Sequence, residues 1–151
     1  MGYDIHRLVT GRKLILGGVT IPYKKGLLGH SDADVLVHAL CDALLGAIGL
    51  GDIGTHFPDT SSEFKDISSM IILSRTWDMV WDRGFSLENA DATILAEQPK
   101  LAQYRTAMRQ NIAGVMNVAP HCINIKATTT EKLGMFGRGE GVGAMCVVLL
   151  S

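Results

Sequence analysis

The chain has 151 residues, the usual size of one domain, so the sequence predicts a single domain over residues 1–151. Apolar residues make up 47% and charged residues 19% of the chain. This composition excludes a disordered protein and favours one that covers part of its surface in an oligomer. The 14 Lys and Arg residues nearly balance the 15 Asp and Glu residues, so we expect no nucleic-acid partner.

The lack of a recognisable targeting signal and the positions of the cysteines indicate a reducing compartment. No apolar run approaches the roughly 18 residues of a membrane span, and Asp4 and Arg7 stand where a signal peptide would have its apolar core. Cys41, Cys122 and Cys146 are far apart and lie in apolar stretches, which is typical of reduced core thiols. We therefore expect a cytoplasmic protein without a membrane partner.

The predicted elements alternate between strands and helices along the chain. We expect a strand pair over residues 13–22, a helix over 32–50 with Ser31 as its N-cap, a polar loop over 51–64 and a helix over 66–83. A strand over 87–99, a helix over 101–117, a strand over 121–130, a glycine-rich segment and a strand over 144–150 follow. This order predicts an α/β fold (an α+β sandwich), with a mixed β-sheet and helices packed on one face.

Two clusters of polar residues could bind a metal ion. Asp4 and His6 alternate along an expected strand, so their side chains emerge on one face, either as a surface pair or as two metal ligands. Asp34, His38 and Asp42 form a polar stripe on an otherwise apolar helix, which must be buried or line a cleft. The stripe is either a hydrogen-bond ladder, or His38 joins Asp4 and His6 in a zinc site with one open position. In the second case Asp34 or Asp42 would orient an imidazole.

Three further segments could meet phosphate groups. The run TTTEK at residues 128–132 offers hydroxyls, a carboxylate and an ammonium group, which suit a phosphate and a divalent cation or, alternatively, a helix cap. His30 and Ser31 stand at the expected start of a helix, where backbone N–H groups favour anions. The glycine-rich segment at 137–143 precedes a strand, so it is neither a Rossmann nor a Walker loop. Its Arg138 either contacts a phosphate or pairs with Glu140 in a turn.

Five motifs in this order resemble one family. They are GYDIH, LLGHSDADVLVHALCDALLGA, LGDIG-x-x-FPDT, EQPK and KATTTEKLG-x-x-GRGEG. Together they cover nearly the whole chain and are similar to 2-C-methyl-D-erythritol 2,4-cyclodiphosphate synthase of the non-mevalonate isoprenoid pathway. The resemblance implies a homotrimeric, metal-dependent phosphorus–oxygen lyase with active sites between subunits. Such an enzyme converts 4-diphosphocytidyl-2-C-methyl-D-erythritol 2-phosphate into the cyclic diphosphate and CMP, in bacteria or, after removal of a targeting segment, in a plastid-type organelle.

The resemblance also assigns roles to individual residues. The implied zinc ligands are Asp4, His6 and His38. His30 and Thr129 match positions that assist the transition state, and Glu131 matches the ligand of a Mg²⁺ or Mn²⁺ ion on the diphosphate. The implied substrate-binding residues are Asp4, His6, His30, Ser31, Asp52, Ile53, Gly54, Phe57, Pro58, Asp59, Thr60, Ser61, Ala96, Glu97, Gln98, Pro99, Lys100, Leu101, Ala102, Thr128, Thr129, Thr130, Glu131, Met135 and Arg138.

The sequence departs from the family pattern at two places. Met135 stands where a phenylalanine is usual, and TSSEF at residues 60–64 replaces the commoner Thr-Asp-Pro-x-Phe. The implied partners are other copies of the chain, a cytidine diphosphate-type substrate and an isoprenoid phosphate in a central channel. Two other functions remain open: a non-catalytic trimer that binds metal and an isoprenoid phosphate, and a zinc phosphohydrolase.

Overall fold

The computed structural model describes residues 1–151 and contains one five-stranded sheet and one small hairpin. The sheet consists of β1 (Gly2–Val9), β4 (Gly26–Leu27), β5 (Leu87–Leu95), β6 (Ile123–Thr128) and β7 (Gly141–Leu150). Their order is β4-β1-β7-β5-β6, and every neighbouring pair is antiparallel except β5 and β6, which are parallel. The hairpin pairs β2 (Leu14–Leu16) with β3 (Val19–Ile21). The predicted mixed sheet is therefore confirmed.

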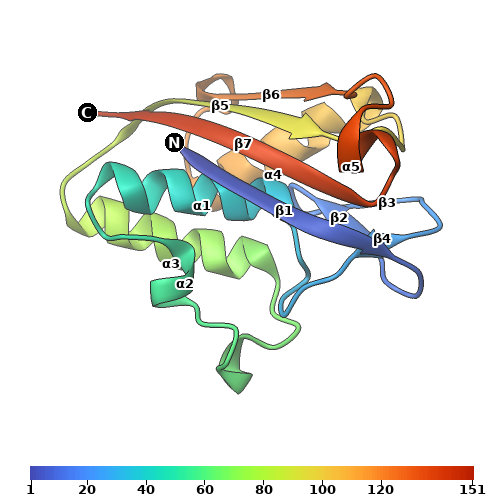
Figure 1. Ribbon diagram of the computed structural model, residues 1–151. Coiled ribbons are helices and arrows are strands. Elements are labelled where there is room, and N and C mark those ends of the chain that lie inside the picture. Colours follow the sequence, from blue (N-terminus) through green and yellow to red (C-terminus); the bar gives the residue numbers. More distant parts are fainter.

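The three long helices lie on the same side of the sheet (Figure 1). Helix α1 (Val35–Ala47) packs on β1 and β7, α4 (Arg105–Met116) packs on β6, and α3 (Ser69–Asp82) packs against α1 and α4. The predicted polar loop at 51–64 contains a short helix, α2 (Ile53–His56), and another short helix, α5 (Gly134–Gly137), lies in the glycine-rich segment. No helix is both long and apolar enough to cross a membrane.

The start of α1 differs from the prediction. Ala33 has a φ of 58°, so the chain is not yet helical there, and Asp34 rather than Ser31 is the N-cap. The Asp34 carboxylate accepts hydrogen bonds from the N–H groups of Val37 at 3.2 Å, Gly17 at 2.9 Å and Gly18 at 2.8 Å. Burial raises the pKa of Asp34 to about 6, although these bonds act in the opposite direction. The carboxylate thus ties the β2–β3 turn to the beginning of α1.

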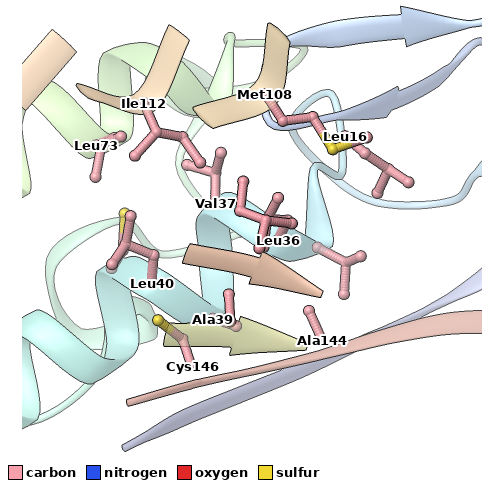
Figure 2. Close-up of a cluster of buried hydrophobic side chains, with 14 of the residues drawn as sticks. Leu16, Leu36, Val37, Ala39, Leu40, Leu73, Met108, Ile112, Ala144 and Cys146 are labelled. Carbon is pink, nitrogen blue, oxygen red and sulfur yellow. The ribbon is translucent and has the colours of Figure 1, made fainter. Parts of the chain in front are cut away.

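The core lies between the sheet and the helices (Figure 2). Leu36 and Leu40 of α1 are buried there together with Leu73 of α3. Strand β1 approaches α1 so closely that a Cβ atom on Gly2 would overlap the carbonyl oxygen of Ala39. The small residues at this contact place β1 directly on α1.

Most of the opposite face of the sheet is left uncovered by the chain; the short helix α5 reaches it at one end of β7, where Phe136 lies against Gly143. Along β7, the side chains of Met145, Val147 and Leu149 are exposed on this face, and Tyr3 of β1 lies beside Met145. Apolar residues therefore occupy both faces of β7, and only one of these faces is packed within the chain.

The three cysteines are free thiols, as predicted. Cys41 and Cys146 are buried, whereas Cys122 is only half-buried. Burial raises the pKa of both Cys41 and Cys146 to about 12. Because the thiolate is the reactive form, these two thiols should be chemically inert in the native protein.

We expect a thiol reagent such as DTNB at pH 8 to modify Cys41 and Cys146 at least about a hundredfold more slowly in the native than in the denatured protein. Mass spectrometry of peptides after a short labelling pulse identifies the modified residues. Labelling in guanidinium chloride, where all three thiols should react, is the control. Rapid native labelling of Cys146 would contradict its placement on the inner face of β7.

Candidate active site and metal centre

Asp4, His6 and His38 meet between β1 and α1. Asp4 and His6 alternate on β1 and point to the face that packs on α1, which carries His38. The Asp4 Oδ2 atom lies 3.0 Å from His6 Nε2 and 3.0 Å from His38 Nδ1, and the two nitrogens are 3.2 Å apart. The three ligand atoms thus converge from two elements that are 32 residues apart in sequence.

The surroundings of His6 leave its Nε2 atom directed into this cluster. His6 Nδ1 lies 2.9 Å from the carbonyl oxygen of Leu28, which can only accept, so Nδ1 carries the hydrogen. Two imidazole nitrogens and one carboxylate oxygen are a typical donor set for zinc, and three protein ligands leave a position for substrate. The donor set therefore fits the predicted metal ion.

The electrostatics show that the cluster favours positive charge beside Asp4. Burial on its own would raise the pKa of Asp4, but hydrogen bonds from His38 and His6 bring it well below its usual range. Burial would likewise lower the pKa of His6, but its hydrogen bond to Asp4 raises that pKa. The carboxylate is thus held ionised, as a metal ligand must be.

The cluster opens into a cavity of about 560 Å³. The predicted substrate-binding residues that line it are Asp4, His6, His30, Ser31, Ile53, Gly54, Phe57, Pro58, Asp59 and Thr60. Asp42 accepts a 3.3 Å hydrogen bond from Ile53 N–H, and His30 Nε2 donates to the Ser61 carbonyl at 2.8 Å, so both ends of this loop are tied to the site. Gly29 leaves room for His6, because a Cβ atom there would lie 3.2 Å from its ring.

A second pocket of about 230 Å³ lies beside the ends of β5 and β6. The predicted residues that line it are Ala96, Pro99, Lys100, Leu101, Ala102, Thr128 and Thr129. Next to it, Thr129 Oγ1 donates to Glu131 Oε1 at 2.8 Å. No residue lines both pockets, and β1 and β6 are separated by two strands, about 14 Å across the sheet. One chain therefore presents two separate groups of predicted site residues.

The YgbB family model matches residues 1–151. The chain belongs to the YgbB family. A relative from Geobacillus kaustophilus, named 2-C-methyl-D-erythritol 2,4-cyclodiphosphate synthase, is 60% identical over 149 residues, which are 99% of this chain and 94% of the relative. The family resemblance of the sequence motifs is therefore confirmed.

Solved structures of family members have the same fold. The bifunctional IspDF from Campylobacter jejuni is 48% identical with a TM-score of 0.95, and the match covers 99% of this chain and 40% of that one. A 2C-methyl-D-erythritol-2,4-cyclodiphosphate synthase in a CDP-bound form is 39% identical with a TM-score of 0.90, with coverage of 99% and 97%.

Several predicted YgbB-family site residues lie outside the two pockets. They are Asp52, Ser61, Glu97, Gln98, Thr130, Glu131, Met135 and Arg138. Asp52 caps α2 through Thr55 N–H, and Glu97 Oε2 accepts from Lys132 N–H at 3.4 Å. Arg138 pairs with Glu140 at 2.5 Å on the surface, which is the ion pair in a turn that the sequence left open.

The expected role of Asp34 or Asp42 in orienting an imidazole is wrong. Asp34 precedes the first turn of α1, and its carboxylate is used by three backbone N–H groups, while Asp42 bonds Ile53. His38 Nε2 instead lies 2.9 Å from Ser69 Oγ and 3.1 Å from Ser31 Oγ. The sequence prediction missed Ser69, because nothing in its local pattern distinguishes it from Ser68, the N-cap of α3.

We expect His38→Ala to abolish zinc binding, because only Asp4 and His6 would remain as ligands. The fold should be retained, because His38 is half-buried at the cavity and alanine favours the helix. The measurement is the zinc-to-protein ratio by elemental analysis, with circular dichroism on the same sample. His56→Ala, which removes a histidine bonded to the Leu50 carbonyl outside the cluster, is the control. Full zinc occupancy in His38→Ala would make His38 a structural histidine.

Proposed function

We propose that the chain converts 4-diphosphocytidyl-2-C-methyl-D-erythritol 2-phosphate into 2-C-methyl-D-erythritol 2,4-cyclodiphosphate and CMP, as a metal-dependent lyase of non-mevalonate isoprenoid biosynthesis. The convergence of Asp4, His6 and His38 at the wall of the 560 Å³ cavity supports this function best. The names of the relatives and the CDP-bound family structure agree with it.

The proposed metal sites use the donors that the chain provides. Asp4, His6 and His38 would hold a zinc ion, which when bound polarises a phosphoryl oxygen as a Lewis acid. Glu131 would bind Mg²⁺ or Mn²⁺ through its carboxylate, which suits these hard cations. The Thr129 hydroxyl lies beside that carboxylate and can turn to a phosphoryl oxygen.

The reaction joins two anionic groups of one substrate. An oxygen of the 2-phosphate forms a bond to the β-phosphorus, and the bond between that phosphorus and the bridging oxygen breaks, so CMP leaves with the electron pair. The two groups repel each other, so the site must hold them in line and stabilise the charge. His30 beside the metal cluster and Thr129 in the second pocket are our candidates for this task.

We propose that each active site forms between two chains of a homotrimer. The metal cluster and the second pocket lie too far apart in one chain to hold the two ends of a single diphosphate. The exposed apolar face of β1 and β7 supports association, because such faces are usually covered. A central channel lined by these faces would also suit an isoprenoid phosphate.

Product analysis separates this function from its alternatives. We expect phosphorus NMR of the reaction to show the cyclic diphosphate and CMP in equal amounts. An open-chain phosphate product would indicate a phosphohydrolase, and a complete lack of CMP release in the presence of zinc and magnesium would indicate a binding protein. Either result would overturn the proposed activity.

We expect Thr129→Ala to lower kcat by about 10²–10³-fold, because a hydroxyl donor matters most as charge builds in the transition state. CDP affinity should change little, since Glu131 and residues 96–102 would carry ground-state binding. No helix begins at residues 129–132, which argues against a capping role. Turnover and melting temperature are measured on one preparation, with the surface variant Thr10→Ala as the control; normal turnover with a lowered melting temperature would defeat the catalytic assignment.

Mixing two inactive variants tests the shared active site. We expect His38→Ala and Glu131→Gln, each inactive alone, to recover activity after they are unfolded together and refolded. Each proposed site takes its metal ligands from one chain and Glu131 from the neighbouring chain. In a random mixture about a quarter of the sites then combine two intact halves, so about a quarter of wild-type activity should return. Sedimentation velocity on the same sample gives the oligomeric state. A stable, fully active monomer would contradict the trimer.

A further inference from the structure

His38 is held from the side opposite Asp4 by hydroxyl groups. Its Nδ1 atom faces the Asp4 carboxylate, and its Nε2 atom lies 2.9 Å from Ser69 Oγ. Ser69 is fully buried in the first turn of α3, the helix that packs alongside α1 (Figure 1). The ring of His38 therefore contacts β1 on one side, and Ser31 of the loop before α1 and Ser69 of α3 on the other.

The direction of these hydrogen bonds follows from the groups involved. Ser69 Oγ also forms a hydrogen bond with Asp32 Oδ1, and Ser69 N–H donates to Asp32 Oδ2 at 3.0 Å. A carboxylate only accepts, and a hydroxyl has a single hydrogen, so Ser69 gives that hydrogen to Asp32. The remaining lone pairs of Ser69 Oγ face His38, so Nε2 carries a hydrogen, and Nδ1 is the ring nitrogen that is left to bind a metal ion beside Asp4.

The position of Asp32 is fixed by its backbone. Asp32 N–H donates to the Ile67 carbonyl at 3.0 Å, and Asp66 N–H donates to the His30 carbonyl at 2.8 Å. Two backbone hydrogen bonds therefore join the loop before α1 to the loop before α3 next to Asp32. This pairing leaves the carboxylate little freedom to turn away from Ser69.

We propose that Ser69 and Asp32 are positioning residues that hold His38 in the tautomer and orientation needed to bind the metal ion. This role rests on the proposed metal centre and adds to it two residues that touch neither the ion nor the substrate. Metal-bound histidines usually donate their second N–H to such a partner, and removal of that partner weakens metal binding. The alternative is that the Asp32–Ser69 contact only joins two loops and has no effect on the metal.

Zinc affinity separates the two roles. We expect Ser69→Ala to weaken zinc binding by about 10- to 100-fold in a competition titration with a chromophoric chelator. The matched control is Ser68→Ala, which removes the N-cap of the same helix at the adjacent, exposed position. It should lower the melting temperature but leave zinc affinity within about twofold of the wild type, since Ser68 has no contact with His38.

A second variant keeps the hydroxyl and the volume of the site. In Asp32→Asn a single amide oxygen replaces the two oxygens that accept from Ser69 Oγ, Ser69 N–H and Asp34 N–H. With that oxygen on Ser69 N–H, the NH₂ group lies opposite Ser69 Oγ. The Ser69 hydroxyl must then turn its hydrogen toward His38 Nε2, which favours the tautomer with a proton on Nδ1. We expect this variant to lose zinc affinity to a similar extent even if Ser69→Ala does not fold.

NMR detects the hydrogen bond between His38 Nε2 and Ser69 Oγ directly. In ¹⁵N-histidine-labelled protein saturated with zinc, we expect a slowly exchanging Nε2–H signal that disappears in His38→Ala and exchanges rapidly in Ser69→Ala. Unchanged zinc affinity and an unchanged signal in the variants would overturn the positioning role alone. A wild-type chain that binds no zinc would overturn the metal centre of the proposed function and the positioning role with it.

Discussion

Strand β1 lies against helix α1 with backbone in contact with backbone at one point, because Gly2 has no side chain and Ala39 has a small one. This approach brings the inward-facing side chains of β1 within 3.2 Å of the helix residue His38. A larger residue at Gly2 would push the strand away and separate the donor atoms. The cluster of Asp4, His6 and His38 therefore depends on a packing contact between the backbones of β1 and α1.

The polar groups around the cluster have a different role: they orient the imidazole rings of His6 and His38. The Leu28 carbonyl orients His6, and the hydroxyls of Ser31 and Ser69 lie behind His38. These partners come from the loop before α1 and from the first turn of α3. These two segments therefore orient the side chains that β1 and α1 bring together. The arrangement is rigid on one side, while the cavity opens toward the loop that carries α2.

The cluster could be predicted from the sequence because two simple periodicities are enough to find it: alternation in a strand and an apolar helix with one polar stripe. The predicted role of Asp34 was wrong, because Asp34 is the N-cap of α1 and does not continue the helical periodicity of the polar stripe. Ser69 could not be predicted at all, since its contact with His38 spans 31 residues and depends on how two helices pack. The sequence predicted helices on one face of the sheet, but it did not show which side chains of β7 face away from them, because β7 is apolar on both faces.

The glycine beside His6 limits how the protein can change over time. A side chain at Gly29 would lie 2.8 Å from the Cβ atom of Ala33 as well as against the imidazole, so that wall of the site is closed to every other residue. The loop on the far side of the cavity is exposed at many positions and tolerates a different sequence. Changes in the ligand specificity of the cavity must therefore arise in residues 51–64, while the wall that carries Asp4, His6 and His38 stays the same.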